Sequence, residues 1–128
     1  MPPHVLAFGE LDTLRGTDFN DPVAVRRFHF RISEVVRAYV ESRWSLNATD
    51  LTTEEILPEL GGLADLPATE AVRLTEFLRA TDSVKFAEHR PPPAEIEGTW
   101  ERALGFVEAS RPRPEPEAAA AEIEREAA

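Results

Sequence analysis

The sequence predicts an all-α fold, a compact bundle of about five helices built around one long helix at about residues 21–46. The first observation is a set of apolar residues spaced three and four apart, which share one face of that helix: Val25, Phe28, Ile32, Val35, Val36 and Tyr39. The second is the start of the helix, where Asp21 is a good N-cap and Pro22 occupies the favoured first position. An apolar face of this length must be buried, so other helices have to pack around it.

Length and composition are those of one globular domain followed by a tail. The chain has 128 residues, of which 42% are apolar and 30% charged. We predict a helical domain over residues 1–110 and a disordered tail rich in Pro, Glu and Ala over residues 111–128, because the tail offers only Ile123 to a core. The chain has no cysteine, which excludes disulfides and cysteine-ligated metal sites.

Charge and hydropathy limit the location and partners that we expect. The net charge is −10, and the tail, with three arginines and five glutamates, accounts for only −2 of it. Such an acidic body repels phosphate backbones, so we expect no nucleic-acid partner. No run of 18 apolar residues occurs, and the N-terminus is unlike a signal peptide. We therefore expect a cytoplasmic segment that does not itself insert into a membrane.

Two shorter helices flank the long one. The first is expected from about residue 4 to residue 15, ended by Gly16, on the spacing of Val5, Leu6, Phe8, Leu11 and Leu14. After the long helix, Thr52 and Glu55 form a capping box, which predicts a short helix that Gly61 and Gly62 end. Its expected core contacts are Leu51, Ile56, Leu57 and Leu60.

Two further helices complete the prediction. One runs from Ala68 to Thr81, and its core face consists of Ala71, Leu74, Phe77 and Leu78. Beyond it, Val84 and Phe86 alternate, which indicates an extended segment or a short turn. Prolines at residues 91–93 then break the chain before a final helix to about Ala109, anchored by Ile96, Trp100, Leu104 and Val107.

The sequence contains no pattern that indicates catalysis. His4, His29 and His89 lie far apart and lack a second ligand at metal-binding spacing, and no nucleophile elbow or phosphate-binding loop is present. We therefore expect no enzyme activity, no catalytic residue, no metal site and no cofactor.

The long helix carries a second strip that is the best candidate for a partner-binding site. Phe30, Arg37 and Trp44 are seven residues apart and so nearly aligned, and Arg26 and Arg27 lie close by. The strip is either a second core seam, with the arginine stem packed on the rings, or a patch that binds a protein, since Trp and Arg are enriched at interface hot spots. The charges on this helix otherwise favour a solvated face, with Arg37 paired to Glu34 or Glu41.

The main alternative function is a nucleic-acid-binding domain of the helix-turn-helix kind. Short helices joined by tight turns favour it, but a recognition helix needs basic or amide side chains. The capped helix after Thr52 offers Glu54, Glu55 and Glu59 instead. A third possibility is an intramolecular scaffolding or regulatory domain that binds no separate ligand.

Several segments together resemble a known family. They are Phe28, residues 32–44, residues 48–56 with Leu-Thr-Thr-Glu-Glu, and residues 82–87 with Asp-Ser-Val-Lys-Phe-Ala. In this order and spacing they are similar to the helical cytoplasmic domain of Bat-type (aerotolerance) membrane proteins and of related small membrane-anchored bacterial proteins. The resemblance covers roughly residues 3–109.

The resemblance implies an adaptor and not an enzyme. Such proteins are encoded beside MoxR-type AAA+ ATPases and von Willebrand A-domain proteins, so it implies one of these as a partner and a tether to the inner membrane in the full-length protein. It brings no catalytic motif to carry over. For its own motifs it implies fold-specifying roles, with Asp82 capping a turn, Val84 and Phe86 inserted in the core and Lys85 pointing outward.

Overall fold

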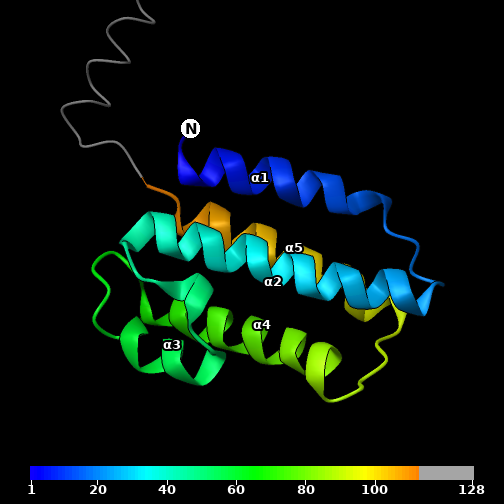
Figure 1. Ribbon diagram of the computed structural model, residues 1–128. Coiled ribbons are helices and arrows are strands. Elements are labelled where there is room, and N and C mark those ends of the chain that lie inside the picture. Colours follow the sequence, from blue (N-terminus) through cyan, green and yellow to red (C-terminus); the bar gives the residue numbers. More distant parts are fainter. Residues whose placement is uncertain (113–128) are drawn as a thin grey trace, which may run out of the picture.

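The computed structural model describes residues 1–112, and every regular element in that range is helical (Figure 1). The expected all-α fold is confirmed. Residues 113–128 of the predicted disordered tail lie outside the described residues. The described elements are α1 (Pro3–Thr13), the 3₁₀ turn η1 (Leu14–Gly16), α2 (Pro22–Trp44), the 3₁₀ turn η2 (Ala48–Asp50), α3 (Thr53–Leu60), α4 (Ala68–Phe86) and α5 (Pro93–Ser110).

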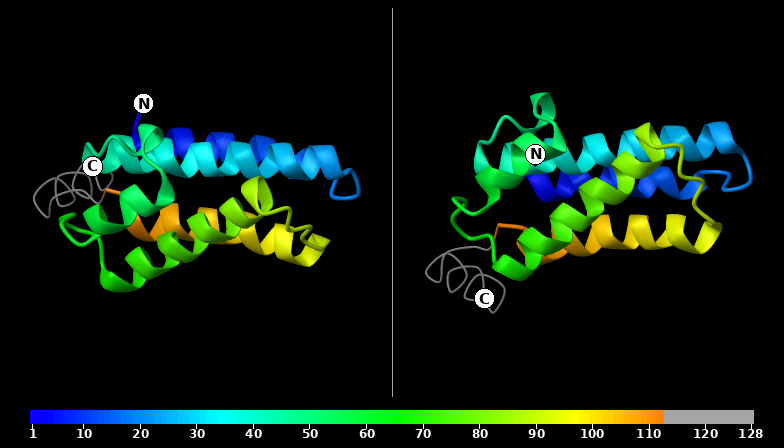
Figure 2. Two further views of the ribbon diagram at one scale, coloured as in Figure 1. Left: turned by 60° about the horizontal axis from the view of Figure 1, so that its bottom comes forward. Right: turned by 90° about the horizontal axis from the view of Figure 1, so that it is seen from below.

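Helix α2 is the centre of the bundle, as its length predicts. It contacts α1, α4, α5 and the turn η2, while α5 also packs against both α1 and α4. Figures 1 and 2 show α1, α2 and α5 running side by side, with α4 at an angle to them in Figure 2 and the short α3 at one end, where it packs on α4. The first half of α2 lies at the other end, close to the connection between α4 and α5 (Figure 1).

The predicted core face of α2 is confirmed, because all six of its apolar residues are buried. They meet Leu11 of α1, Ile56 of α3, Phe77 of α4 and Phe106 of α5 in one apolar cluster. The caps also form as their chemistry indicates. The Asp21 carboxylate accepts a hydrogen bond from the Val23 N–H at 3.0 Å, and the capping box of Thr52 and Glu55 is complete.

Helix α4 is longer than predicted. We expected it to end at Thr81, but it continues to Phe86. The helical spacing explains the extension, since buried Phe77, Thr81 and Val84 follow one another at intervals of four and three on the face that meets the core. The apparent alternation of Val84 and Phe86 is therefore not a strand pattern.

The roles implied for residues 82–87 are corrected at three positions. Asp82 lies inside α4 and accepts a hydrogen bond from the Thr53 hydroxyl at 2.6 Å, so it does not cap a turn. Lys85 turns inward and donates to the Ser33 hydroxyl at 3.3 Å. Phe86 is 70% exposed and lies outside the core, whereas Val84 is buried as expected.

Candidate functional site

The strip of Phe30, Arg37 and Trp44 does not form one surface. Arg37, in its middle, is only 9% exposed. We had expected Arg37 to pair with Glu34 or Glu41, but it pairs with neither. Its guanidinium is directed instead at the segment that follows α2. There it donates hydrogen bonds to the backbone carbonyls of Ala48 and Leu51. Arg37 is therefore not available to a partner in this structure.

Arg37 belongs to a buried polar cluster that joins α2, α3 and α4. Its Nε donates to the Ser33 hydroxyl at 3.2 Å and its Nη2 to the Thr53 hydroxyl at 3.0 Å. Thr53 in turn donates to Asp82, which lies 3.9 Å from the Lys85 ammonium. One signal in the sequence points to this cluster, namely that Ser33 precedes Arg37 by one helical turn on a mainly apolar stretch.

Burial changes the acidity of both cations in this cluster. Burial, with repulsion from Arg37, lowers the pKa of Lys85, and the Asp82 carboxylate partly opposes this change. Burial also lowers the pKa of Arg37, again opposed by Asp82. Arginine remains charged at any physiological pH. The Asp82 carboxylate thus acts on buried Arg37 and on partly buried Lys85, with Glu34 as a second, weaker influence on Lys85, which favours a structural role for the cluster.

Trp44 packs at the end of the bundle where α3 lies. Its ring contacts those of Tyr39 and Phe106, and its Nε1 donates to the Ala64 carbonyl at 3.0 Å. Arg43 covers the ring with its guanidinium 4.9 Å from the centroid. These contacts fit the core-seam interpretation of Trp44, and they separate it from Phe30.

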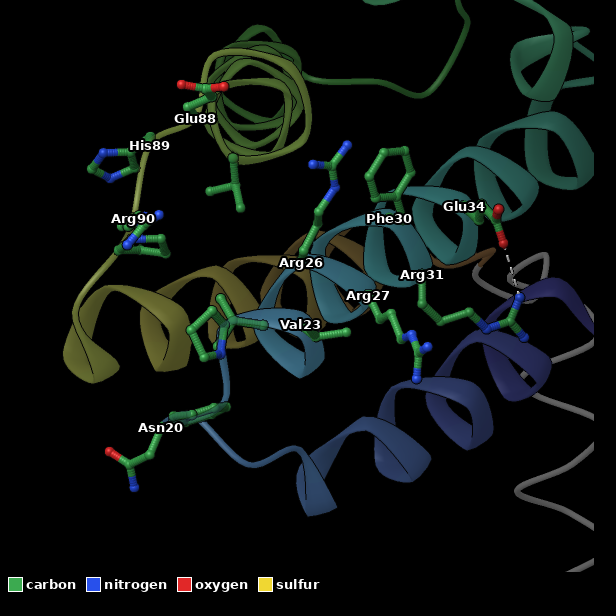
Figure 3. A pocket seen from close by; sticks show the side chains of 15 residues that line it. Asn20, Val23, Arg26, Arg27, Phe30, Arg31, Glu34, Glu88, His89 and Arg90 are labelled. Carbon is green, nitrogen blue, oxygen red and sulfur yellow. Dashed lines mark hydrogen bonds and ion pairs between the residues drawn. The ribbon is translucent and has the colours of Figure 1, made fainter.

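The other predicted site residues, Phe30, Arg26 and Arg27, meet in one groove. It has a volume of about 900 Å³ and lies over the first half of α2, next to the α4–α5 connection. In Figure 3, Arg26 and Phe30 point toward α4, whereas Arg27 and Arg31 point toward α1. We call it the arginine groove, defined by its lining: Phe19, Asn20, Pro22, Val23, Val25, Arg26, Arg27, Phe30, Arg31, Glu34, Val84, Glu88, His89, Arg90 and Pro91.

The arginine groove is basic on a chain that is otherwise strongly acidic. Four arginines and two glutamates line it, while the net charge of the whole chain is −10. Arg31 is already paired, to Glu34 at 3.2 Å and to Glu10 at 3.5 Å. Within residues 1–112, Arg26, Arg27 and Arg90 are exposed and form no ion pair. The groove therefore presents three cations to solvent without carboxylate partners of their own.

An aromatic pair stands at the edge of the groove. The rings of Phe30 and Phe86 meet edge to face, with centroids 5.9 Å apart. The Arg26 guanidinium lies 5.4 Å and the Lys85 ammonium 5.2 Å from the centre of the Phe30 ring. Phe30 is thus half-buried and held in place, while Phe86 is mostly in water. The two rings thus place apolar surface next to the cations at the edge of the groove.

The α4–α5 connection forms the far wall of the groove. Glu88 has a positive φ of 58°, and the backbone N–H groups of Ala87 and His89 both donate to the Ser83 carbonyl. His89 is paired to Glu95 at the start of α5, with 2.8 Å between Nε2 and Oε2. This connection brings Arg90 to the groove. Sequence reasoning missed Phe86 and Arg90 as site residues, because nothing in the chain order places Phe86 against Phe30 or Arg90 in the same groove as Arg26.

The described part of the chain has neither a metal-binding group nor a helix that could cross a membrane. Residues 1–112 contain no group of three His, Asp or Glu side chains that could hold a metal ion. In the same range, no helix has the length and apolar character needed to cross a membrane. Comparison of the chain with protein-family models, curated proteins and solved structures finds no match.

Proposed function

We propose that the chain is a non-catalytic protein-interaction module that binds a partner through the arginine groove. The observation that carries this proposal is the set of Arg26, Arg27 and Arg90, exposed and without ion pairs within residues 1–112, around the Phe30–Phe86 pair. Arginine and aromatic residues are enriched where protein interfaces gain most of their binding energy. Among them, the half-buried Phe30 is already in contact with Arg26, Lys85 and Phe86, which reduces the entropy that this ring loses on binding.

The resemblance to Bat-type membrane proteins suggests the class of protein to which the partner belongs. It favours a MoxR-type AAA+ ATPase or a von Willebrand A-domain protein. In this proposal the module acts as an adaptor on the cytoplasmic side of the inner membrane, as part of a longer, membrane-anchored protein.

A nucleic-acid-binding function is the alternative, since arginines also bind phosphate. Two observations disfavour it. The exposed positions of the capped helix α3 include Glu54, Glu55 and Glu59, so α3 does not resemble a recognition helix. The groove also has an apolar edge that a phosphate backbone would leave unused, and the surrounding chain is acidic.

A pull-down from a nuclease-treated lysate of the source cells tests the proposal. The baits are the full chain, the double variant Arg26→Glu/Arg27→Glu and the control Arg102→Glu. Arg102 is exposed on α5, outside the groove, and forms no ion pair within residues 1–112. We expect an AAA+ ATPase or a von Willebrand A-domain protein with the unchanged chain and the control, and its loss with the double variant.

Two results would contradict the proposal. If all three baits captured the partner equally, the groove would not be the binding surface. If proteins were captured only from a parallel lysate that had not been treated with nuclease, nucleic acid would mediate the capture, and the alternative function would be favoured. Circular dichroism of each bait shows that lost binding is not lost folding.

A further inference from the structure

We propose that the arginine groove selects a short acidic peptide segment in which carboxylates flank one bulky apolar side chain. This inference rests on the proposed protein-interaction function and specifies the chemistry of the partner. It follows from three features of the groove. These are the positions of its cations, the Phe30–Phe86 pair at its edge and the net charge of the chain.

The cations set the requirement for carboxylates. Arg26 and Arg27 point to opposite sides of α2, toward α4 and toward α1, and Arg90 lies on the far wall (Figure 3). A segment that crosses α2 between them therefore meets a cation on either side. Guanidinium groups bind carboxylates in bidentate geometry, which fixes orientation as well as adding energy. Each exposed pair contributes only modestly, so charge alone makes a weak and salt-sensitive complex.

The aromatic edge sets the requirement for one apolar side chain. Val23, which is 58% exposed, and half-buried Phe30 line the groove. Phe86 is 70% exposed and lies just outside this lining, against the Phe30 ring. A Phe or Leu side chain placed against these groups removes apolar surface from water on both partners. Phe30 contacts Arg26, Lys85 and Phe86 already, so this edge does not have to be ordered on binding.

The surrounding charge favours a short acidic segment over a long polyanion. The groove is a local basic region on a chain of net charge −10. A nucleic acid would extend past the groove along a chain whose net charge is −10, and that net charge repels phosphates. A peptide of a few residues stays within the groove.

Fluorescence anisotropy with the full chain tests this specificity. The probe is a labelled peptide, Gly-Glu-Glu-Asp-Phe-Glu-Glu-Asp-Gly. Its matched controls replace Phe by Ala, or replace every Glu and Asp by Gln and Asn, and a single-stranded DNA oligonucleotide of twelve thymidines tests for polyanion binding. We expect the parent peptide to bind and each peptide control to bind on the order of tenfold more weakly. Raising the salt from about 20 mM to about 300 mM should weaken the parent complex.

Variants of the chain locate the binding. Arg26→Glu/Arg27→Glu and, separately, Phe86→Ala should each weaken the parent peptide on the order of tenfold, whereas Arg102→Glu should not. Phe86 is exposed, so its variant reports on the groove even if the charge reversal disturbs folding. Equal binding of the parent and Ala peptides, tighter binding of the oligonucleotide, or no effect of the variants would each overturn the inference.

The two proposals fail in different ways. If the groove variants abolish capture of the partner protein but no acidic peptide binds, the interaction function stands and the acidic specificity is wrong. If capture is unchanged by the groove variants, the proposed function itself fails, whatever the peptides do.

Discussion

Arg37 shows what a single buried cation does in this fold. It joins α2 to the segment after it through the Ala48 and Leu51 carbonyls and to α3 through Thr53. Replacing it by methionine keeps the apolar stem but removes the donor to the Leu51 carbonyl and the Thr53 hydroxyl, while the Ala48 carbonyl keeps its bond from the Leu51 N–H. We expect Arg37→Met to lower the free energy of unfolding by about 2–4 kcal/mol, measured by urea denaturation. Arg102→Met, the exposed control, should change it by less than about 0.5 kcal/mol. Equal midpoints for the two variants would show that the buried hydrogen bonds contribute nothing net.

His29 makes stability depend on pH. Its Nδ1 lies 2.7 Å from the Val25 carbonyl, which can only accept, so the proton is on Nδ1. Burial is the largest cause of its lowered pKa, opposed by the hydrogen bond to Val25 and by the charge of Glu95. The folded chain therefore binds fewer protons than the unfolded chain once the pH falls below about 6.5, and stability falls from there downward.

The His29→Asn variant isolates that contribution. Its amide can still donate near the position of Nδ1, but it does not titrate. Between pH 8 and pH 5, denaturation of the original chain should show a steeper loss of stability than that of the variant. Parallel curves would mean that His29 is as easily protonated in the fold as outside it.

Side-chain roles were only partly predictable. The helical period correctly predicts that Arg37 projects from α2 in nearly the same direction around the helix axis as Phe30 and Trp44. It does not say what lies opposite, and the carbonyls of residues 48 and 51 are brought there by a turn that no periodicity describes. The angle therefore could not separate a buried arginine from an exposed one.

Among the elements, α4 gives the clearest distinction between two interpretations of one segment. As a strand-like segment it would bury both Val84 and Phe86, whereas as a helix it buries Val84 and exposes Phe86. We expect Val84→Ala to cost about 1.5–3 kcal/mol of unfolding free energy and Phe86→Ala less than about 1 kcal/mol. Thermal or urea denaturation measures both. A loss of several kcal/mol for Phe86→Ala would place that ring in the core and contradict the helical end of α4.

Helix starts were more predictable than helix ends. Asp21 with Pro22, and Thr52 with Glu55, are local signals, because the side chain that caps the helix lies next to it in the chain. The end of α4 depends on contacts with residues distant in sequence, such as Asp82 with Thr53 and Lys85 with Ser33. A local pattern contains no information about those contacts.

The molecule as a whole separates its charge. Within residues 1–112, a basic groove lies where the first half of α2 meets the connection after α4, although the chain as a whole is acidic. Three of the five predicted site residues, Arg26, Arg27 and Phe30, line it, since they lie close together on one helix. The other wall of the groove, with Glu88 and Arg90, comes from a segment about 60 residues further along the chain. It could not be predicted from the sequence, because only the packing of the bundle brings that segment next to α2.

Site-specific photo-crosslinking tests most directly whether this groove binds a protein. A photoreactive benzoylphenylalanine replaces Val23 in the groove or, as the control, Val72 on α4, outside it, with illumination in the source cells. The two valines are matched in exposure, at 58% and 56%. We expect a discrete covalent adduct with a partner protein from position 23 and none from position 72. Adducts from position 72 alone, or equally from both positions, would contradict the assignment of the groove as the docking surface.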